Sequence, residues 1–244
     1  MDWRERDGVR WLEAELPGAR AAFSTRVGGV SEARYEALNV AILTGDEHDR
    51  VRENRRRLAT SLERAPEGVV MGRQVHGVEL LKHEAQQAPR VYADVVRSPD
   101  QVDAHATSNS DLTPLVMVAD CLPVAMVGPG GVAMAHCGWR GLAGGIVSKA
   151  ANEVGAQAAA VGPGIGPCCY EVGEEVLSEF DDLDGVARGR MLDLMAVATA
   201  LLERSGVTAV ESSGLCTSCN AELFYSHRRD GERTGRQAGL VWME

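Results

Sequence analysis

Aromatic side chains and long apolar runs are both scarce in this sequence. Phe, Trp and Tyr make up 5% of the 244 residues, whereas hydrophobic residues together make up 45%. That apolar content is ordinary for a folded protein and excludes a disordered chain, so we expect a core of mainly small aliphatic side chains. No stretch approaches the roughly 20 apolar residues that a membrane-spanning helix needs, and we therefore expect no membrane partner.

Positive charge is also in short supply. Lys and Arg number 25 against 35 Asp and Glu, which gives a formal net charge of -10. A nucleic-acid partner is not expected, because its phosphate backbone would be repelled. A small anionic substrate remains compatible with this charge, since a few arginines can form a local positive pocket.

The first seven residues are MDWRERD, which lack the apolar segment of a signal peptide. We therefore expect a cytoplasmic protein with reduced cysteines.

The length and the order of apolar segments favour a single domain over residues 1–244. Residues 85–100, with Pro89 and Pro99, are expected to be loop and short strand. Strands and helices are interleaved irregularly, which indicates an α+β fold with mixed sheets. Apolar runs and turn residues predict strands near 21–26, 69–71, 115–118, 122–127, 132–135, 158–162 and 207–210. Helices are predicted near 49–65, 142–154, 174–180 and 191–205.

Three side chains suggest a metal site. His76, Cys121 and His136 each follow or end an apolar segment beside glycine or aspartate. Imidazole and thiolate are the ligands that Zn²⁺ prefers, and three protein ligands with one open position are typical of a catalytic site. The alternative is that the two histidines and the cysteine pack separately, because they lie far apart in the sequence.

The remaining cysteines give weaker signals. Cys216 and Cys219 form a CxxC pair, and Cys168 and Cys169 are adjacent. A second CxxC is missing, and neighbouring cysteines are poorly placed to bind one ion, so these four residues are expected to be buried or loop thiols.

Two arginines are candidate anion ligands. Arg26 precedes Gly28 and Gly29, and Arg140 lies between Trp139 and Gly141. Glycine loops expose backbone N–H groups, and a nearby arginine can bind a phosphate or carboxylate with two donors. The segment 227–230 (HRRD) is read as structural, and His105 as a hydrogen-bonded core residue.

Several motifs in order along the chain resemble the YfiH family, whose members were first called laccase-domain or multicopper polyphenol oxidases and are now described as purine nucleoside phosphorylases. The likeness extends from about residue 21 to 242. It is carried by residues 23–31 (FSTRVGGVS), 74–77 (QVHG), 119–124 (ADCLPV), 136–141 (HCGWRG), 162–173 (GPGIGPCCYEVG) and 224–230 (FYSHRRD).

The resemblance implies a layered α/β/β/α sandwich with mixed sheets, like that of the cytotoxic-necrotizing-factor type of cysteine hydrolase. It implies that His76, Cys121 and His136 form the zinc-binding and catalytic group, with copper as the alternative metal. It also implies phosphorolysis of purine nucleosides, including methylthioadenosine, together with adenosine deamination. The expected partners are purine nucleosides and phosphate, bound by a monomer or weak homo-oligomer.

Three positions depart from the family pattern: Cys137, His105 and Cys219. None is one of the three expected ligands, but they bear on substrate preference. Asp120, beside Cys121, is expected either to act catalytically, by orienting a ligand or moving a proton, or to cap a turn.

Two rival activities use the same residues. A cysteine hydrolase, such as an amidase that edits peptidoglycan precursors, would use Cys121 as nucleophile and His136 as base. A copper oxidase would use the two histidines and the cysteine as a blue-copper site. A multicopper oxidase also needs a trinuclear copper cluster, and the two sites together would need more histidines than the six in the chain. A non-enzymatic binding protein is the third alternative.

Overall fold

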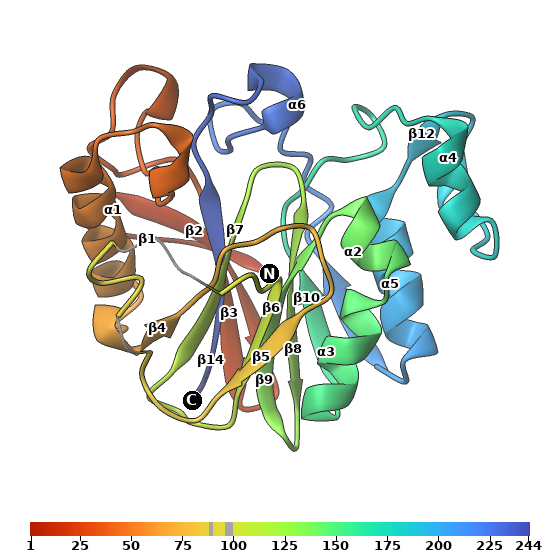
Figure 1. Cartoon of the computed structure of the whole chain (residues 1–244), viewed down its shortest axis with the longest axis horizontal. Coiled ribbons are helices and arrows are strands. Elements are labelled where there is room, and N and C mark those ends of the chain that lie inside the picture. Colours follow the sequence, from red (N-terminus) through yellow and green to blue (C-terminus); the bar gives the residue numbers. More distant parts are fainter. Residues whose placement is uncertain (88–89, 96–99) are drawn as a thin grey trace.

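Two six-stranded sheets face each other and are flanked by helices in the computed structural model (Figure 1). The structure describes residues 1–87, 90–95 and 100–244. Pro89 and Pro99, expected in a loop, lie outside the described residues. Within the described part of the chain, no helix is long and apolar enough to cross a membrane.

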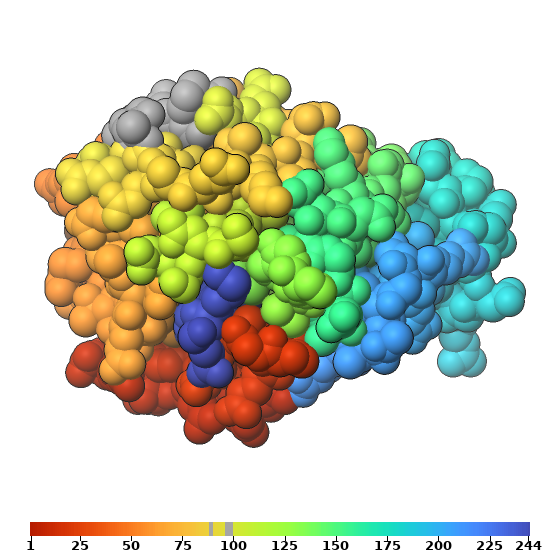
Figure 2. Space-filling view, turned by 90° about the horizontal axis from the view of Figure 1, so that it is seen from below, coloured from red at the N-terminus to blue at the C-terminus, as the bar shows by residue number. Residues whose placement is uncertain are grey.

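The first sheet joins the two ends of the chain. Its strand order is β1 (Asp2–Arg6), β2 (Val9–Leu16), β3 (Ala19–Ser24), β14 (Gln237–Met243), β7 (Thr113–Val118) and β4 (Val69–Val70). The last strand, β14, runs antiparallel to both β3 and β7, so the N-terminal and C-terminal segments lie side by side, as Figure 2 shows in red and dark blue. β4 pairs with β7 in parallel, which makes this sheet mixed.

The second sheet is centred on the hairpin of β8 and β9. Its strand order is β13 (Ala209–Ser212), β10 (Ala158–Val161), β8 (Leu122–Gly128), β9 (Gly131–Cys137), β6 (Ala104–Thr107) and β5 (Leu80–His83). The hairpin turn at residues 128–131 falls where the glycines predict it. A Cβ at Gly131 would lie 2.1 Å from the carbonyl oxygen of Thr107, and its φ is +114°, so only glycine fits this position. β10 with β13 and β5 with β6 are parallel pairs, whereas the other pairs are antiparallel.

Three hydrophobic layers hold these elements together. Between the sheets, Leu12 and Phe23 from the first sheet pack with Met134 from the second. On the outer face of the first sheet lies α1 (His48–Ser61), whose Leu58 joins a separate core cluster. The second sheet is covered by α2 (Trp139–Ala143), α3 (Ile146–Val154) and α5 (Leu194–Arg204). This is the α/β/β/α sandwich expected from the resemblance.

Most predicted elements are present with shifted ends: the helix predicted over 49–65 ends at Ser61, and the strand predicted over 207–210 is Ala209–Ser212. Two predicted helices differ more. The helix predicted over 191–205 begins only at Leu194, because Met191–Leu192 form strand β12, which pairs with β11 (Ala187–Arg188). The carboxylate of Asp193 then caps the helix by accepting the N–H groups of Met195 and Ala196. The helix predicted over 142–154 is two helices, interrupted by Gly145 at a φ of +88°.

Short elements complete the chain. The α-helices are α4 (Glu174–Leu177) and α6 (His227–Asp230), and the 3₁₀ helices are η1 (Ala33–Tyr35), η2 (Ile42–Thr44), η3 (Pro66–Gly68) and η4 (Ser178–Phe180).

Leucines on two strands provide a test of the packing between the sheets. Leu12 on β2 is 4% exposed within the inter-sheet core, whereas Leu81 on the edge strand β5 is 37% exposed. Leu12→Ala should lower the free energy of unfolding by about 2–5 kcal/mol, because it leaves a cavity in the core. Leu81→Ala should cost roughly 0.5 kcal/mol or less. Denaturant unfolding measures both changes, and equal losses would contradict the layer assignment.

Candidate metal site and its cavity

His76, Cys121 and His136 come together although they lie far apart in the sequence. His76 is in the loop after β4, Cys121 immediately precedes β8, and His136 is the penultimate residue of β9. Because Leu122 pairs with Cys137 and Pro123 with His136, the hairpin places Cys121 next to His136. The three candidate ligand atoms all lie within 4.8 Å of one another, and the two imidazole rings meet edge-on with their centroids 4.9 Å apart.

A buried carboxylate that the sequence analysis did not identify holds two of these elements together. Asp103 accepts a hydrogen bond from Nδ1 of His136 at 2.8 Å. The same carboxylate accepts the backbone N–H groups of Val75, His76 and Gly77 at distances of 2.8–3.2 Å. Asp103 therefore orients the His136 ring and also fixes the loop of His76, whose φ is +61°. Its only sequence signal is its position just before the strand segment 104–107.

Neighbouring charges shift the pKa values of this group. Burial alone would raise the pKa of the Cys121 thiol, but the neighbouring His136 and His76 lower it. Burial alone would lower the pKa of His136, but the Cys121 thiolate and Asp103 raise it. Burial also opposes ionisation of Asp103, yet the hydrogen bonds from His136 and Gly77 lower its pKa to about 2. The directions of these pKa shifts favour the charged form of each of the three groups.

The space around the three side chains is kept open by a glycine. A Cβ at Gly138 would lie 2.9 Å from Sγ of Cys121 and 3.2 Å from Cδ2 of His76. The sulfur and the two imidazoles therefore converge at a position that a larger residue would obstruct. Two imidazoles and one thiolate are a donor set that suits Zn²⁺, and a carboxylate on the second nitrogen of a ligating histidine is a common feature of zinc sites. The residues present fit such an ion.

Asp120 has a different environment from Asp103. One carboxylate oxygen accepts the hydroxyl of Thr217 at 2.6 Å, and the other accepts the backbone N–H of Arg228 at 2.6 Å. Asp120, whose own backbone has a φ of +87°, thus links the segment of Cys121 to the loop of Thr217 and to helix α6. These contacts favour the capping role over a catalytic one.

A cavity of about 680 Å³ opens at the three side chains. Its volume is in the range of small-molecule sites. Two aromatic residues, Trp139 and Tyr170, are part of its wall, and its acidic lining residues are Asp120 and Glu232. The lining also contains the arginines Arg55, Arg73, Arg140, Arg228 and Arg236. The cavity is therefore locally basic in a protein whose net charge is -10.

The arginines differ in their availability. Arg55 is buried and donates to the carbonyl oxygens of Val40, Val91 and Tyr92, so it has a structural role. Arg140 is exposed at the start of α2, with its guanidinium 4.4 Å from the centre of the Trp139 ring. A half-buried residue, Arg236, has its pKa lowered by burial, against the raising effect of the Cys121 and Asp120 charges.

The sequence pointed to Arg26 as well as Arg140, and the structure separates the two. Arg26 donates from its guanidinium to the carbonyl oxygens of Glu36 and Ala221 and stacks on the ring of Tyr225. Among the described residues that line the cavity, Arg140 is present and Arg26 is not.

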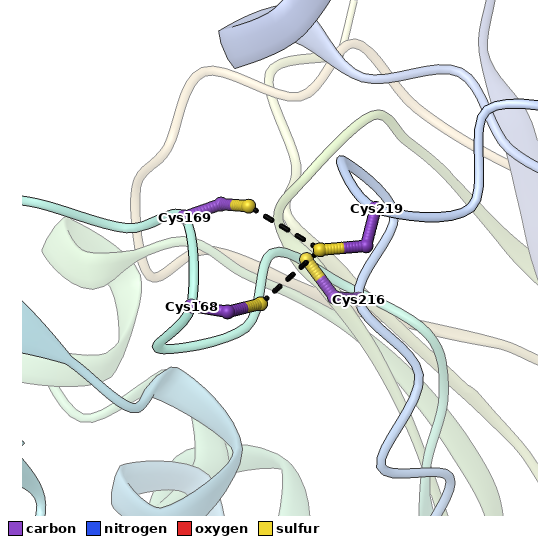
Figure 3. A group of neighbouring side chains, drawn as sticks. All are labelled: Cys168, Cys169, Cys216 and Cys219. Atoms are coloured by element: carbon purple, nitrogen blue, oxygen red, sulfur yellow. Dashed lines mark hydrogen bonds between the residues drawn. The ribbon is translucent and has the colours of Figure 1, made fainter.

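The three departures from the family pattern lie outside the His–Cys–His group. Cys137 is fully buried in the core between the second sheet and its helices, where burial raises the pKa of its thiol. His105 is a buried core histidine whose Nδ1 lies 3.0 Å from Nε2 of His83, as expected of a hydrogen-bonded core residue. Cys219 lies beside Cys168, Cys169 and Cys216 in a second group of thiols (Figure 3).

Segment 227–230 combines two roles. Arg229 donates to the carbonyl oxygens of Thr217, Ser218 and Phe224 and pairs with Asp230, so the structural reading is confirmed for this residue. By contrast, His227 and Arg228 line the cavity.

Comparisons with known proteins agree over nearly the whole chain. A purine nucleoside phosphorylase of Pseudomonas aeruginosa is 36% identical, over 96% of this chain and 98% of that protein. The purine nucleoside phosphorylase YfiH of Escherichia coli is 37% identical, over 93% of this chain and 94% of its own. The crystal structure of YlmD from Geobacillus stearothermophilus is 32% identical and superimposes with a TM-score of 0.87, covering 99% of this chain and 98% of that one.

The family-level result covers the same region. Residues 20–244 match the family described as multi-copper polyphenol oxidoreductase laccase. Because this match extends over more than half of the chain and the relatives named above exceed 30% identity, the chain belongs to this laccase-domain family, which includes proteins named YfiH and YlmD.

Proposed function

We propose that this chain is a zinc-dependent purine nucleoside phosphorylase that also accepts methylthioadenosine and deaminates adenosine. One observation carries the proposal: the two imidazoles and the thiolate open into a basic cavity that is large enough for a small molecule. The names of the relatives, which are purine nucleoside phosphorylases, supply the substrate class. The net charge of -10 makes this local cavity necessary for an anionic co-substrate.

Phosphate is assigned to the arginine side of the cavity. Arg140 can present planar N–H donors to phosphate oxygens, which suits two-point binding. Arg236 also lines the cavity, although its Nη1 donates to the carbonyl oxygens of Thr234 and Gly235. In phosphorolysis a phosphate oxygen forms a bond to the ribose C1′ while the bond from C1′ to the purine nitrogen breaks. The two guanidinium groups would hold the nucleophile in position and balance its charge.

The purine is assigned to the aromatic part of the wall. Trp139 and Tyr170 line the cavity, and Arg140 and Arg228 lie over their rings at 4.4 and 5.1 Å from the centroids. A flat purine can pack against such a ring by stacking. This arrangement would place the base and the phosphate on neighbouring parts of one wall, as a phosphorylase requires.

His76, Cys121 and His136 would hold the zinc ion. When bound, zinc supplies a Lewis acid to this end of the cavity and makes water more acidic. The contribution of the chain is to keep the His136 ring fixed through the hydrogen bond from its Nδ1 to Asp103, while the ring also forms a hydrogen bond with Cys121. Deamination of adenosine replaces the C6 amino group with the oxygen of water and releases ammonia, without phosphate.

A cysteine hydrolase, such as an amidase that edits peptidoglycan precursors, is the second candidate. The observation that favours it is the sequence of contacts from the Cys121 thiolate to His136 and from His136 to Asp103, which resembles a nucleophile, base and orienting carboxylate. Full activity on an amide substrate after complete zinc removal would support the hydrolase over the phosphorylase.

The family description suggests a third candidate, a copper oxidase. Two histidines and one cysteine also match the ligands of a blue-copper site. A thiolate–copper centre would give intense visible absorption in the purified protein, whereas zinc would give none.

Loss of a candidate ligand tests the metal proposal. Cys121→Ala should remove about one zinc ion per chain relative to the wild type, because two imidazoles alone bind zinc weakly. Phosphorolysis of inosine and deamination of adenosine should both fall to background. Elemental analysis and the two assays are made on the same preparation. Wild-type zinc content in the variant would exclude Cys121 as a ligand.

Asp103 orients the proposed zinc ligands without being one of them, so its substitution tests the orientation of the His136 ring separately from ligation of the zinc itself. Asp103→Asn weakens the hydrogen bond to His136 and the contacts to the His76 loop, so zinc affinity at this site should fall about 10- to 100-fold. Asp120→Asn is the comparison variant, since that carboxylate binds Thr217 and Arg228. Competition with a chromophoric chelator measures both affinities. A larger effect at Asp120 would reverse the assignment of the two carboxylates.

Steady-state kinetics of both reactions test the anion site. Arg140→Ala should raise the apparent KM for phosphate roughly 10- to 100-fold, corresponding to about 1.5–3 kcal/mol for a charged hydrogen bond. Adenosine deamination should change less, because it uses no phosphate. Arg26→Ala should leave the KM for phosphate near the wild-type value and instead lower stability, because Arg26 holds backbone carbonyls. An increased KM for Arg26→Ala alone would return the phosphate role to Arg26.

A further inference from the structure

Four cysteines from two separate loops face one another away from the His–Cys–His group (Figure 3). Cys168 and Cys169 lie in the loop that follows β10, and Cys216 and Cys219 in the loop that follows β13. Sγ of Cys219 is 3.4 Å from Sγ of Cys168 and 3.4 Å from Sγ of Cys169. All four sulfur atoms lie within 4.8 Å of one another.

These separations suit one tetrahedral ion. Zinc–thiolate bonds of about 2.3 Å in a tetrahedron place the sulfurs about 3.8 Å apart. Two of the separations here are 3.4 Å, and all four sulfurs lie within 4.8 Å of one another. A disulfide would require a separation near 2.05 Å, and all four cysteines are free thiols. The four cysteines are buried or loop thiols, as expected, but the backbone around Cys168 and Cys169 directs both of these neighbouring sulfurs to the same side (Figure 3).

The backbone around the sulfurs is already ordered for binding. The N–H of Gly166 donates to Sγ of Cys216 at 3.2 Å, and the N–H of Thr217 donates to the carbonyl oxygen of Gly164 at 2.9 Å. The side chain of Asn220 donates to the carbonyl oxygen of Cys216 at 2.8 Å. These hydrogen bonds hold the two loops face to face, which reduces the entropy lost when an ion binds.

Four protein ligands indicate a structural rather than a catalytic ion, because no coordination position is left for substrate. Cys216 is buried, whereas Cys168 and Cys219 are exposed, so an ion has access from solvent. We propose that these four thiolates bind one structural zinc ion that joins the loop after β10 to the loop after β13. Binding replaces four S–H protons with four Zn–S bonds and releases the protons to the buffer, so no oxidant is needed.

The proposed ion would also steady the wall of the cavity. Thr217, between the two cysteines of the CxxC pair, donates its hydroxyl to Asp120, the residue before Cys121. The carbonyl oxygens of Thr217 and Ser218 accept hydrogen bonds from the guanidinium of Arg229. The four-cysteine site therefore acts as a positioning element for the segment that carries Cys121 and does not depend on which reaction the cavity catalyses.

The test compares zinc content among full-length variants purified with zinc and a thiol reductant. The wild type should hold about two zinc ions per chain. Cys216→Ser should lose one while keeping the ion of the His–Cys–His group, and Cys121→Ser should lose the other. Equal zinc content in the wild type and Cys216→Ser would overturn the proposal.

A second measurement leaves the four cysteines unaltered, so it tests the proposed zinc site even if the Cys216→Ser variant does not fold. X-ray absorption of the zinc remaining in Cys121→Ser should show four sulfur neighbours at about 2.3 Å, without imidazole scattering. A strong chelator should lower the melting temperature of this variant, because the ion binds only the folded state. Nitrogen or oxygen ligands, an iron signal, absence of zinc, or a disulfide among these residues in the reduced preparation would each overturn the proposal.

Discussion

The carboxylate of Asp103 is the contact on which the metal-site geometry depends. It is fully buried, yet it accepts a hydrogen bond from the His136 ring, whose pKa it raises. It also accepts the N–H groups of three successive residues in the His76 loop. Because a buried carboxylate without partners is costly, this loop and β9 are constrained to meet at one geometry. Cys121 joins them through the pairing of β8 with β9, so one ion-pair network and one hairpin define the whole group.

The layered fold explains how such a polar group is supported. Small side chains such as Ala125, Ala133 and Ala160 allow the strands of the second sheet to pack closely on both faces. The charged group lies where strands end, and its backbone hydrogen bonds are supplied by loops. Two of the few aromatic residues, Trp139 and Tyr170, line the cavity and also pack against the core between the second sheet and its helices.

Acidic and basic residues are distributed unevenly. The chain carries a net charge of -10, but the cavity wall contains arginines from α1, from the loop after β4, from α2, from α6 and from the segment before β14. These arginines come from five parts of the chain, so no single charge run in the sequence marks this basic cavity. The four-cysteine group is likewise assembled from distant parts of the chain, because it joins two loops about 50 residues apart in the sequence.

The sequence by itself determined the order of most strands and helices, the fold class and the three candidate ligands, because hydrophobic periodicity, glycine turns and family motifs are local signals. It did not determine which charged residues meet. Asp103, Arg236 and the partners of Cys168 depend on sheet pairing between distant segments, and Arg26 and Arg140, which look alike beside glycines, have different environments. Only the tertiary structure decided these contacts, because burial and hydrogen bonding across the sandwich select one partner among many that the sequence permits.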